Sequence, residues 1–179
     1  MLEIEVKSPC DDLCRVEKFL VEKGARLTGR RKQIDIYMSH PIRDFGNTDE
    51  ALRIRKEADA GSLTYKGPKI DKDTKSREEL KVNVSDTDTL LTIFRKLGFE
   101  ESGRVEKLRT TYSIRGVTVC LDSVSGLGEF VEAEYEGEDL DSGKKAIFAL
   151  MRELGLEGNE RRSYLELLLE KKDGRRVRG

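Results

Sequence analysis

Residues 1–9 read MLEIEVKSP, and this opening stretch alternates apolar with charged side chains without a break. Apolar side chains at positions 2, 4 and 6 separate Glu3, Glu5 and Lys7. Because successive side chains of a strand point to opposite faces, the stretch is predicted to be a strand with one apolar face and one face made only of charge. Taken alone, such a strand would place its charged face in water, so the other strands must decide where that face points.

Seven more stretches have the composition of β-strands, with alternating, β-branched or aromatic residues bounded by Gly, Asp and Pro. Three amphipathic patterns end at a glycine and predict helices over residues 11–24, 85–98 and 141–155, and a shorter helix is predicted over 162–172. The second helix should be capped by Ser85 or Asp86 and the third by Asp141 or Ser142. The predicted strands are the opening one and those at about 25–38, 50–58, 62–67, 75–84, 99–114, 116–123 and 128–136.

The sequence resembles itself when it is shifted by 74 positions. The stretch KGARLTGRRKQIDIY then lies over LGFEESGRVEKLRTTY, with Gly24 over Gly98 and Arg30 over Arg104. The same shift places the first predicted helix over the second. The order of a strand, a helix, a glycine and a long strand thus occurs twice in the sequence. This repeat predicts two similar halves that join in one sheet. The alternative is a chance similarity of short charged runs.

The overall composition limits the classes of function. A chain of 179 residues is long enough for one domain with its own core, which we place at residues 1–172, followed by a basic tail at 173–179. With 34 Lys and Arg against 35 Asp and Glu, the chain lacks the positive excess of a general nucleic-acid or membrane-surface binder. Three cysteines without CxxC spacing and the lack of a long apolar run favour a soluble cytoplasmic protein. The single histidine, His40, excludes a multi-histidine metal site.

Along most of the predicted strands, the charged residues occupy every second position and therefore share one face of the strand. We call this regular spacing their parity. Arg53 and Arg55 alternate with aliphatic residues in ALRIR, and Glu132 and Glu134 do so in FVEAEY. Amphipathic helices need an apolar sheet face to cover, so the aliphatic faces should point outward and the charged faces inward. The predicted fold is therefore α+β, a closed eight-stranded antiparallel β-barrel that forms a charged tunnel with flanking helices. The alternative is a polar face in water, with ion pairs that contribute little. Charged residues with matching parity on other strands are Lys66, Arg77, Glu79, Lys107, Arg109 and Asp122.

A tunnel crowded with charge needs counter-ions. Two unit charges about 4 Å apart interact by about 4 kcal/mol even at an effective dielectric constant of about 20. A ligand that carries several negative charges, bound together with a divalent cation, would meet this need. Lys and Arg would hold phosphate oxygens, and the carboxylates would hold Mg²⁺ or Mn²⁺, which prefer hard oxygen ligands.

The same segments resemble a known family. ExExK at Glu3, Glu5 and Lys7 is similar to the amino-terminal signature of the CYTH superfamily, the triphosphate tunnel metalloenzymes, which includes class IV (CyaB-type) adenylyl cyclases and thiamine triphosphatases. The resemblance continues through QIDIY, EALRIRK, LTYKGP, SREEL, EKLRTTY, LDSVSGLGEFVEAE and RSYLELL, and so covers nearly the whole chain. The family's fold is an eight-stranded antiparallel barrel, in agreement with the parity of the strands. SGLGEFVE after LD most resembles the cyclase-like branch.

The resemblance also implies roles for individual residues. For each of these residues, the alternative role is an ion pair within the tunnel wall. Tyr37 and Tyr164 fall in matching motifs, where packing explains them as well as contact with a ligand does. Candidate catalytic residues are Glu3, Glu5 and Lys7. Candidate metal ligands, directly or through water, are Glu3, Glu5, Glu79, Asp122, Glu132 and Glu134. Candidate phosphate-binding residues are Lys7, Arg53, Arg55, Lys66, Arg77, Lys107 and Arg109.

These expectations lead to a metal-dependent enzyme that acts on a triphosphate. The cyclase-like assignment, which converts ATP to cyclic AMP and pyrophosphate, is favoured by the motifs. A triphosphatase that acts on inorganic triphosphate, thiamine triphosphate or a nucleotide remains the close alternative, since the same residues would serve both reactions. A non-catalytic polyphosphate or nucleotide sensor would not need the acidic residues. The expected partner is a triphosphate-containing small molecule, without nucleic acid or membrane, and a homodimer is left open.

Overall fold

All eight predicted strands are present in the structure. The computed structural model of the chain describes residues 2–58, 61–68, 77–137, 139–156 and 158–176. Within these residues the strand pairings are antiparallel and four helices accompany the sheet, so the α+β class is confirmed. The strands are β1 (Leu2–Pro9), β2 (Arg26–Ser39), β3 (Ala51–Lys56), β4 (Gly61–Lys66), β5 (Arg77–Val84), β6 (Glu100–Ile114), β7 (Val117–Val124) and β8 (Gly128–Glu136). The helices are α1 (Leu13–Glu22), α2 (Thr87–Lys96), α3 (Leu140–Glu153) and α4 (Tyr164–Arg176).

The strands curl around a common interior in the order β1-β5-β4-β3-β2-β6-β7-β8. β1 pairs with β8 at seven positions, from Glu3 to Pro9. With β5 it pairs at only two, Leu2 with Glu78 and Glu3 with Arg77. The reason is register, because the two antiparallel strands overlap only at their first residues among those that the structure describes. The expected closed barrel is therefore confirmed only in part, since the seam between β1 and β5 is closed at these two described positions alone.

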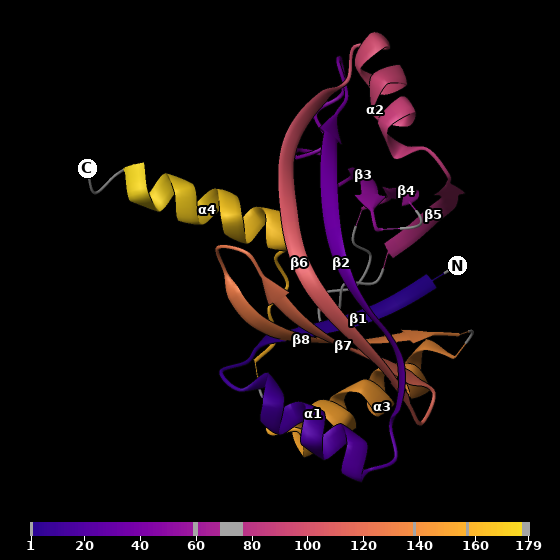
Figure 1. Cartoon of the computed structure of the whole chain (residues 1–179), viewed down its shortest axis with the longest axis vertical. Helices are drawn as coiled ribbons and strands as arrows, with labels where there is room; N and C mark the ends of the chain where they lie inside the picture. The colour runs from indigo at the N-terminus through magenta and orange to yellow at the C-terminus, as the bar shows by residue number, and fades with distance from the viewer. Residues whose placement is uncertain (1, 59–60, 69–76, 138, 157, 177–179) are drawn as a thin grey trace.

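The internal repeat is visible in the structure. α1 and α2 are each 10 residues long, and their first residues, Leu13 and Thr87, differ by the shift found in the sequence. Both helices are capped by an aspartate, Asp12 or Asp86, whose side chain accepts backbone N–H groups of the first turn. The strands that follow, β2 and β6, pair along nearly their whole lengths and run side by side through the molecule (Figure 1). The two halves thus join in one sheet, as the repeat predicts.

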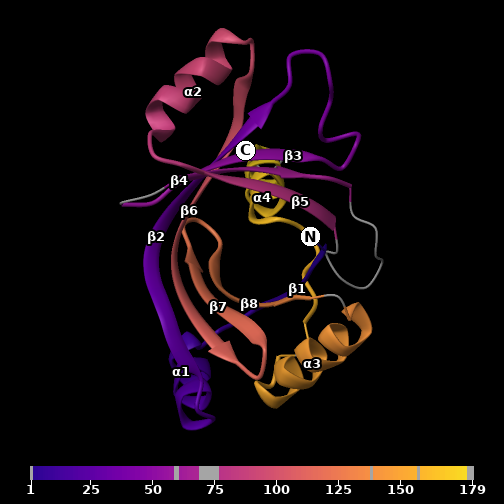
Figure 2. The same ribbon diagram turned by 90° about the vertical axis from the view of Figure 1, so that its right-hand side faces the viewer.

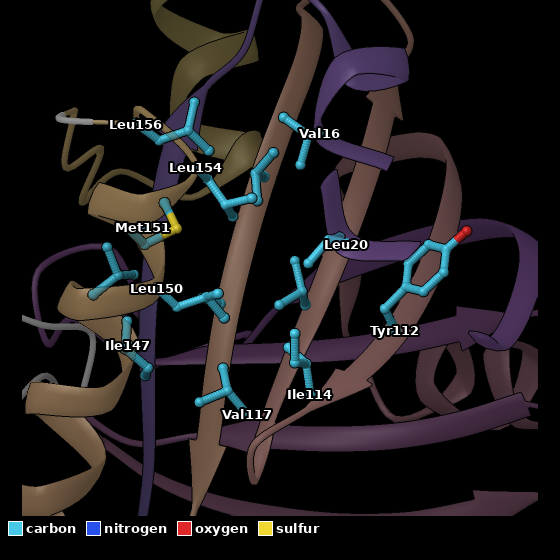
Figure 3. Packing of buried hydrophobic residues seen from close by; sticks show 14 of the residues in the cluster. Val16, Leu20, Tyr112, Ile114, Val117, Ile147, Leu150, Met151, Leu154 and Leu156 are labelled. Atoms are coloured by element: carbon cyan, nitrogen blue, oxygen red, sulfur yellow. The ribbon is translucent and has the colours of Figure 1, made fainter. Parts of the chain in front are cut away.

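The helices cover the apolar outer face of the sheet. α1 and α3 lie at the opposite end of the molecule from α2 (Figure 1) and enclose the largest hydrophobic cluster. Val16 and Leu20 of α1 and Ile147 and Leu154 of α3 are fully buried there (Figure 3). α2 covers a smaller cluster over β2 and β3, and α4 covers a third over β6, β7 and β8. Because the aliphatic faces point outward to the helices, the charged faces are left to line the interior.

Two details of the helices differ from the predictions. α3 is capped by Asp139, whose side chain accepts the N–H of Ser142, and not by Asp141 or Ser142 themselves. The helix begins one residue before them, so both lie in its first turn, where a carboxylate is still favourable to the helix dipole. α4 runs from Tyr164 to Arg176, beyond the predicted end at residue 172, and residues 177–179 lie outside the described chain. Among the described residues, no helix is both long and apolar enough to cross a membrane.

α4 is seated on β6 at a glycine. A Cβ on Gly103 would lie 2.3 Å from Cδ1 of Leu165, so glycine lets the helix approach this closely with Leu165 in its observed position. The helix begins with a capping box, in which Ser163 Oγ accepts the N–H of Glu166 and a Glu166 carboxylate oxygen accepts the N–H of Ser163. α4 then projects from the side of the molecule in Figure 1 and is seen end-on in Figure 2. Its first residues, Tyr164 and Leu165, line the central cavity.

Candidate active site

A cavity of about 940 Å³ occupies the interior of the curled sheet, and its lining includes the segment that joins β2 to β3 and the first turns of α4. The structure brings nearly all the predicted site residues together along it. Asp122 is fully buried behind the lining, in contact with residues that do line it, and the side chain of Glu3 lies outside the described part of the structure. The predicted residues that line the cavity are Glu5, Lys7, Arg53, Arg55, Lys66, Arg77, Glu79, Lys107, Arg109, Glu132 and Glu134.

Three carboxylates gather on one wall. The pairing of β1 with β8 sets Glu5 directly opposite Glu134. Glu132 lies two residues before Glu134 and on the same face of β8. One carboxylate oxygen from each of the three lies within 4.8 Å of the others. Burial and the nearby charges of Glu132 and Glu5 raise the pKa of Glu134, although Arg109 opposes the shift. Buried like charges at this spacing favour a divalent cation, and carboxylate oxygens suit Mg²⁺ or Mn²⁺.

The opposite wall is cationic. In the strand order β3 lies four strands from β8, so Arg53 and Arg55 face the interior across from the acidic cluster. Lys66 on β4 and Arg77 on β5 continue this wall. Lys66 contacts the carboxylate of Glu79, its neighbour in the β4–β5 pairing, and Arg77 reaches the carbonyl oxygen of Gly67 at 3.4 Å. An anion with several charges would therefore meet cations on one side of the cavity and carboxylates on the other.

Asp35 on β2 belongs to this site and was missed by the sequence reasoning. Its two carboxylate oxygens accept hydrogen bonds from Nε and Nη2 of Arg55 at 2.6 and 2.8 Å, and it lies 3.9 Å from Nη1 of Arg53. Burial raises the pKa of Asp35, but Arg53 and Arg55 outweigh burial and hold that pKa well below its usual range. The signal was present, because Asp35 interrupts the aliphatic run of QIDIY with the parity of an interior residue.

Arg53 differs from Arg55 in having an unused donor. Its Nη2 reaches Thr64 Oγ1 at 3.4 Å, but its Nε is buried and has no hydrogen-bond partner among the described residues. An unsatisfied buried donor is costly, and a phosphate oxygen in the cavity would satisfy it. Burial lowers the pKa of Arg53, yet the charge of Asp35 more than compensates and keeps the guanidinium protonated.

Arg109 on β6 connects the cationic residues to the acidic wall. Its Nε and Nη2 donate to the two carboxylate oxygens of Asp122 at 2.7 and 2.5 Å, and it also contacts Glu132 and, at 3.3 Å, Glu134. Lys107, two residues earlier, lies 3.5 Å from Asp122. Burial and the charge of Arg109 lower the pKa of Lys107. Of the predicted metal ligands, Glu79 is thus paired with Lys66, and Asp122, Glu132 and Glu134 all contact Arg109. Glu5, Glu132 and Glu134 form the acidic cluster.

Tyr164 at the start of α4 ties this network to the helix. Its hydroxyl donates to Asp122 Oδ2 at 2.8 Å. Its ring faces two ammonium groups, with Lys7 Nζ 4.1 Å and Lys107 Nζ 4.9 Å from the ring centroid. Lys7 Nζ also donates to the carbonyl oxygen of Arg162 at 2.5 Å. The sequence left the role of Tyr164 open between packing and contact, and the structure shows it bonded to the charged residues of the tunnel wall.

The pattern of the CYTH domain matches residues 1–164 of the chain. The chain belongs to the CYTH family. A Methanocaldococcus jannaschii protein provisionally named adenylate cyclase MJ0240 is 39% identical to it over 172 residues, which cover 93% of this chain and 98% of that protein. The solved structure of the PH1819 protein from Pyrococcus horikoshii has a TM-score of 0.84 at 43% identity, over 94% of this chain and 99% of that one.

A more distant solved structure shares the fold. The solved structure of a Hippeastrum protein, provisionally called an adenylyl cyclase and described as having a dominant triphosphatase activity, has a TM-score of 0.70. Its sequence identity is 16%, over 95% of each chain, so the likeness is one of fold.

Proposed function

We propose that this CYTH protein is a metal-dependent enzyme that acts on a triphosphate inside its charged tunnel, most closely as a class IV adenylyl cyclase that converts ATP to cyclic AMP and pyrophosphate. The observation that carries the proposal is the acidic cluster of Glu5, Glu132 and Glu134 facing a cationic wall across one cavity. A sensor that only bound polyphosphate would need the cationic wall alone.

The metal would be held by Glu5, Glu132 and Glu134, with Mg²⁺ or Mn²⁺ as the ions that suit an all-carboxylate donor set. When bound, such an ion supplies charge neutralisation at the phosphate oxygens and orients the reacting groups. Glu3 stays a candidate on resemblance alone.

The chain's own residues would bind and orient the phosphates. Arg53 offers its unused Nε, and Lys66 and Arg77 extend the cationic wall along the cavity. Lys7 and Arg109 lie closest to the acidic cluster, because Lys7 pairs with Glu132 across the strands and Arg109 contacts both Glu132 and Glu134. These two residues are therefore placed to stabilise charge that develops near the metal.

The name of the Methanocaldococcus jannaschii relative supports the cyclase reading. The alternative is a triphosphatase acting on inorganic triphosphate, thiamine triphosphate or a nucleotide, and the activity described for the Hippeastrum protein supports keeping it. In the first reaction the 3′-hydroxyl of ATP would attack the α-phosphorus and displace pyrophosphate. In the second, water would attack the terminal phosphorus, so that orthophosphate forms and the rest of the substrate leaves as a diphosphate. The phosphate-binding residues would be the same in both.

The deciding experiment is incubation with ATP, inorganic triphosphate and thiamine triphosphate in turn, with Mg²⁺ or Mn²⁺, followed by product analysis. Cyclic AMP with pyrophosphate identifies a cyclase, and orthophosphate identifies a triphosphatase. Glu5→Gln should raise the metal concentration needed for half-maximal activity, while Glu78→Gln on the outer face of β5 should not. Full turnover of the parent protein in EDTA would contradict a metal-dependent mechanism.

A further inference from the structure

One edge of β5 is open beyond the two positions where the strand meets β1. On one side β5 pairs with β4 from Glu79 to Val84, and on the other side only Arg77 and Glu78 pair with β1. Among the residues that the structure describes, no strand pairs with residues 79–84 on that second side. Residues 80–83 are all exposed. An open strand edge is a template for pairing with another chain.

The corresponding edge of β1 is covered by the chain itself. The N–H of Glu160, in the connection between α3 and α4, donates to the carbonyl oxygen of Lys7 at 2.6 Å. Lys7 Nζ donates to the carbonyl oxygen of Arg162 in the same connection. Ile4, Val6 and Lys7 are accordingly almost fully buried. Of the two strands that meet at the seam, β5 is therefore the one with an open edge.

The backbone groups on the open edge follow from the alternation of an antiparallel ladder. The carbonyl oxygen of Glu78 accepts the N–H of Gly67 at 2.9 Å, so the backbone groups of Glu78 point toward β4. Because alternate residues of an antiparallel strand bond to opposite neighbours, those of Val82 also point toward β4. The N–H and C=O groups of Lys81 and Asn83 then point away from β4, toward the open edge. They are placed to bond to a further strand.

The outer face of β5 is apolar and uncovered. Leu80 is 57% exposed and Val82 is 55% exposed, and Val84 shares their face of the strand. Leu80 and Val82 belong to none of the hydrophobic clusters that the described residues form. A partner strand on this edge would bring its own side chains beside these three.

We propose that the open edge of β5 pairs antiparallel with the same edge of a second copy of this chain, around a two-fold axis at Val82. One sheet would then continue from one copy into the other. A second copy fits as the partner because each chain carries 34 Lys and Arg against 35 Asp and Glu, so two copies do not repel one another through net charge. The inference is independent of the reaction that the cavity performs.

The charges along the strand decide the register. With Val82 opposite its own counterpart, Lys81 stands opposite Asn83 of the second copy, and the two-fold axis repeats this pair. The outer faces then place Leu80 opposite Val84 of the second copy. A register centred on Lys81 would set two lysines against each other, which opposes pairing. A register centred on Leu80 would need the part of the edge that β1 already occupies.

The first test is the oligomeric state of the full chain, measured by sedimentation velocity from micromolar to near-millimolar protein. The contact is short, so we expect a reversible dimer whose population rises with concentration. Val82→Lys should abolish it, because the two-fold axis sets the two added charges face to face. Leu108→Lys is the matched control, since Leu108 is 49% exposed on β6, a strand paired on both sides, and this variant should dimerise like the parent. A parent protein that stays monomeric throughout, or unchanged dimerisation in Val82→Lys, would overturn the inference.

A pair of opposite charge changes at one exposed position tests the register. Asn83→Glu would face Lys81 of the second copy and should tighten the dimer roughly two- to tenfold, whereas Asn83→Lys should weaken it by a similar factor. A register centred on Lys81 would instead place Asn83 opposite Glu79 and reverse both signs. The reverse order, or equal dimerisation in the two variants, would therefore contradict the pairing centred on Val82.

Hydrogen exchange supplies a readout that does not use a variant. The amides of Lys81 and Asn83 should exchange slowly only above the concentration at which dimers form. Closure of the seam within one copy would protect β5 equally at every concentration. Exchange of these two amides that does not change with protein concentration would count against the dimer.

Discussion

Arg53 and Arg55 lie two residues apart on β3 and face the same cavity, but their surroundings give them different tasks. Both oxygens of Asp35 are bound by Arg55, whereas Arg53 keeps a buried donor without a partner. We expect Arg53→Ala to weaken binding of a non-hydrolysable triphosphate by roughly ten- to a hundredfold, the equivalent of about 1.5–3 kcal/mol for a charge-assisted contact. Calorimetric titration of the parent protein and the variant measures this loss of affinity.

Arg55→Ala should act mainly on stability, because it removes the bidentate partner of buried Asp35 and leaves the more distant Arg53. A loss of up to about 3 kcal/mol in the free energy of unfolding is expected, measured by denaturant titration. Arg95→Ala, which changes an exposed arginine of α2, should affect neither quantity. Parent-like triphosphate affinity in Arg53→Ala would remove that residue from the phosphate site.

Tyr164 can be tested against a matched tyrosine elsewhere. Its hydroxyl donates to Asp122 inside the tunnel wall, and the hydroxyl of Tyr112 donates to Glu17 at 2.6 Å on the outer face. Tyr164→Phe and Tyr112→Phe should each cost about 0.5–1.5 kcal/mol of stability. Only Tyr164→Phe should also lower turnover, because Asp122 positions Arg109 and Lys107. Equal turnover in both variants would reduce Tyr164 to a packing residue.

At the scale of elements, the connection between α3 and α4 is pinned across β1. The N–H of Glu160 donates to the carbonyl oxygen of Lys7 at 2.6 Å, and Lys7 Nζ donates back to the carbonyl oxygen of Arg162. Hydrogen bonds from the side chain and backbone N–H of Arg162 hold the pKa of Glu160 at about 2. Arg162 also donates to Glu170 of α4 at 2.5 Å. This short connection thus links β1 to α4, whose first residues line the cavity.

The pKa of Glu160 gives a pH prediction with a definite sign. Because its folded-state pKa lies below the ordinary value of about 4.3, its stabilising contribution is present above that pH and is lost as the pH falls toward 2. Arg162→Gln should return the pKa toward its ordinary value, as followed by NMR titration of the carboxyl carbon. Arg161→Gln is the control and should leave the pKa where it is. An ordinary pKa in the parent protein would show that the pairing does not persist in solution.

Local patterns predicted the elements well because the information was local. Alternating, β-branched or aromatic runs located every strand, and terminal glycines marked the ends of α1 and α2. Of the two cap candidates for α2, Ser85 and Asp86, the structure uses Asp86. Parity also indicated which charges share the interior. The cap of α3 was misplaced by a few residues because Asp139, Asp141 and Ser142 are all good capping residues. The pairing of Arg55 with Asp35 depends on the register of β2 with β3, which no local pattern contains.

At the scale of the whole molecule, the sheet is uneven around its circumference. β8 is paired with β1 on one side and β7 on the other, whereas β5 is paired with β4 and meets β1 at only two positions. We expect backbone amides of β5 to exchange with deuterium faster than those of β8. A bound triphosphate should slow exchange in β5, because Arg77, Glu79 and Lys81 line the cavity.

Hydrogen exchange followed by mass spectrometry measures both effects. The control is β7, which is paired on both sides and lies on the far side of β8 from the seam, so its exchange should change little when a triphosphate binds. Exchange in the ligand-free protein that is as slow in β5 as in β8 would show that the seam closes in solution. The seam could not be predicted from the sequence, since it depends on the register of two strands that lie far apart in the chain.

The pairing of β1 with strands that lie far from it in the sequence also affects how the chain folds during translation. Of the eight described strands, β1 leaves the ribosome first, and its main partner, β8, which ends at Glu136, emerges last. At roughly 5–20 residues per second, β1 waits on the order of ten seconds for that partner. A nascent chain that has reached only β7 carries the cationic residues of the tunnel but, of the cluster, only Glu5. The contacts of Arg109 with Glu132 and Glu134, and the acidic cluster itself, can therefore form only when translation delivers β8.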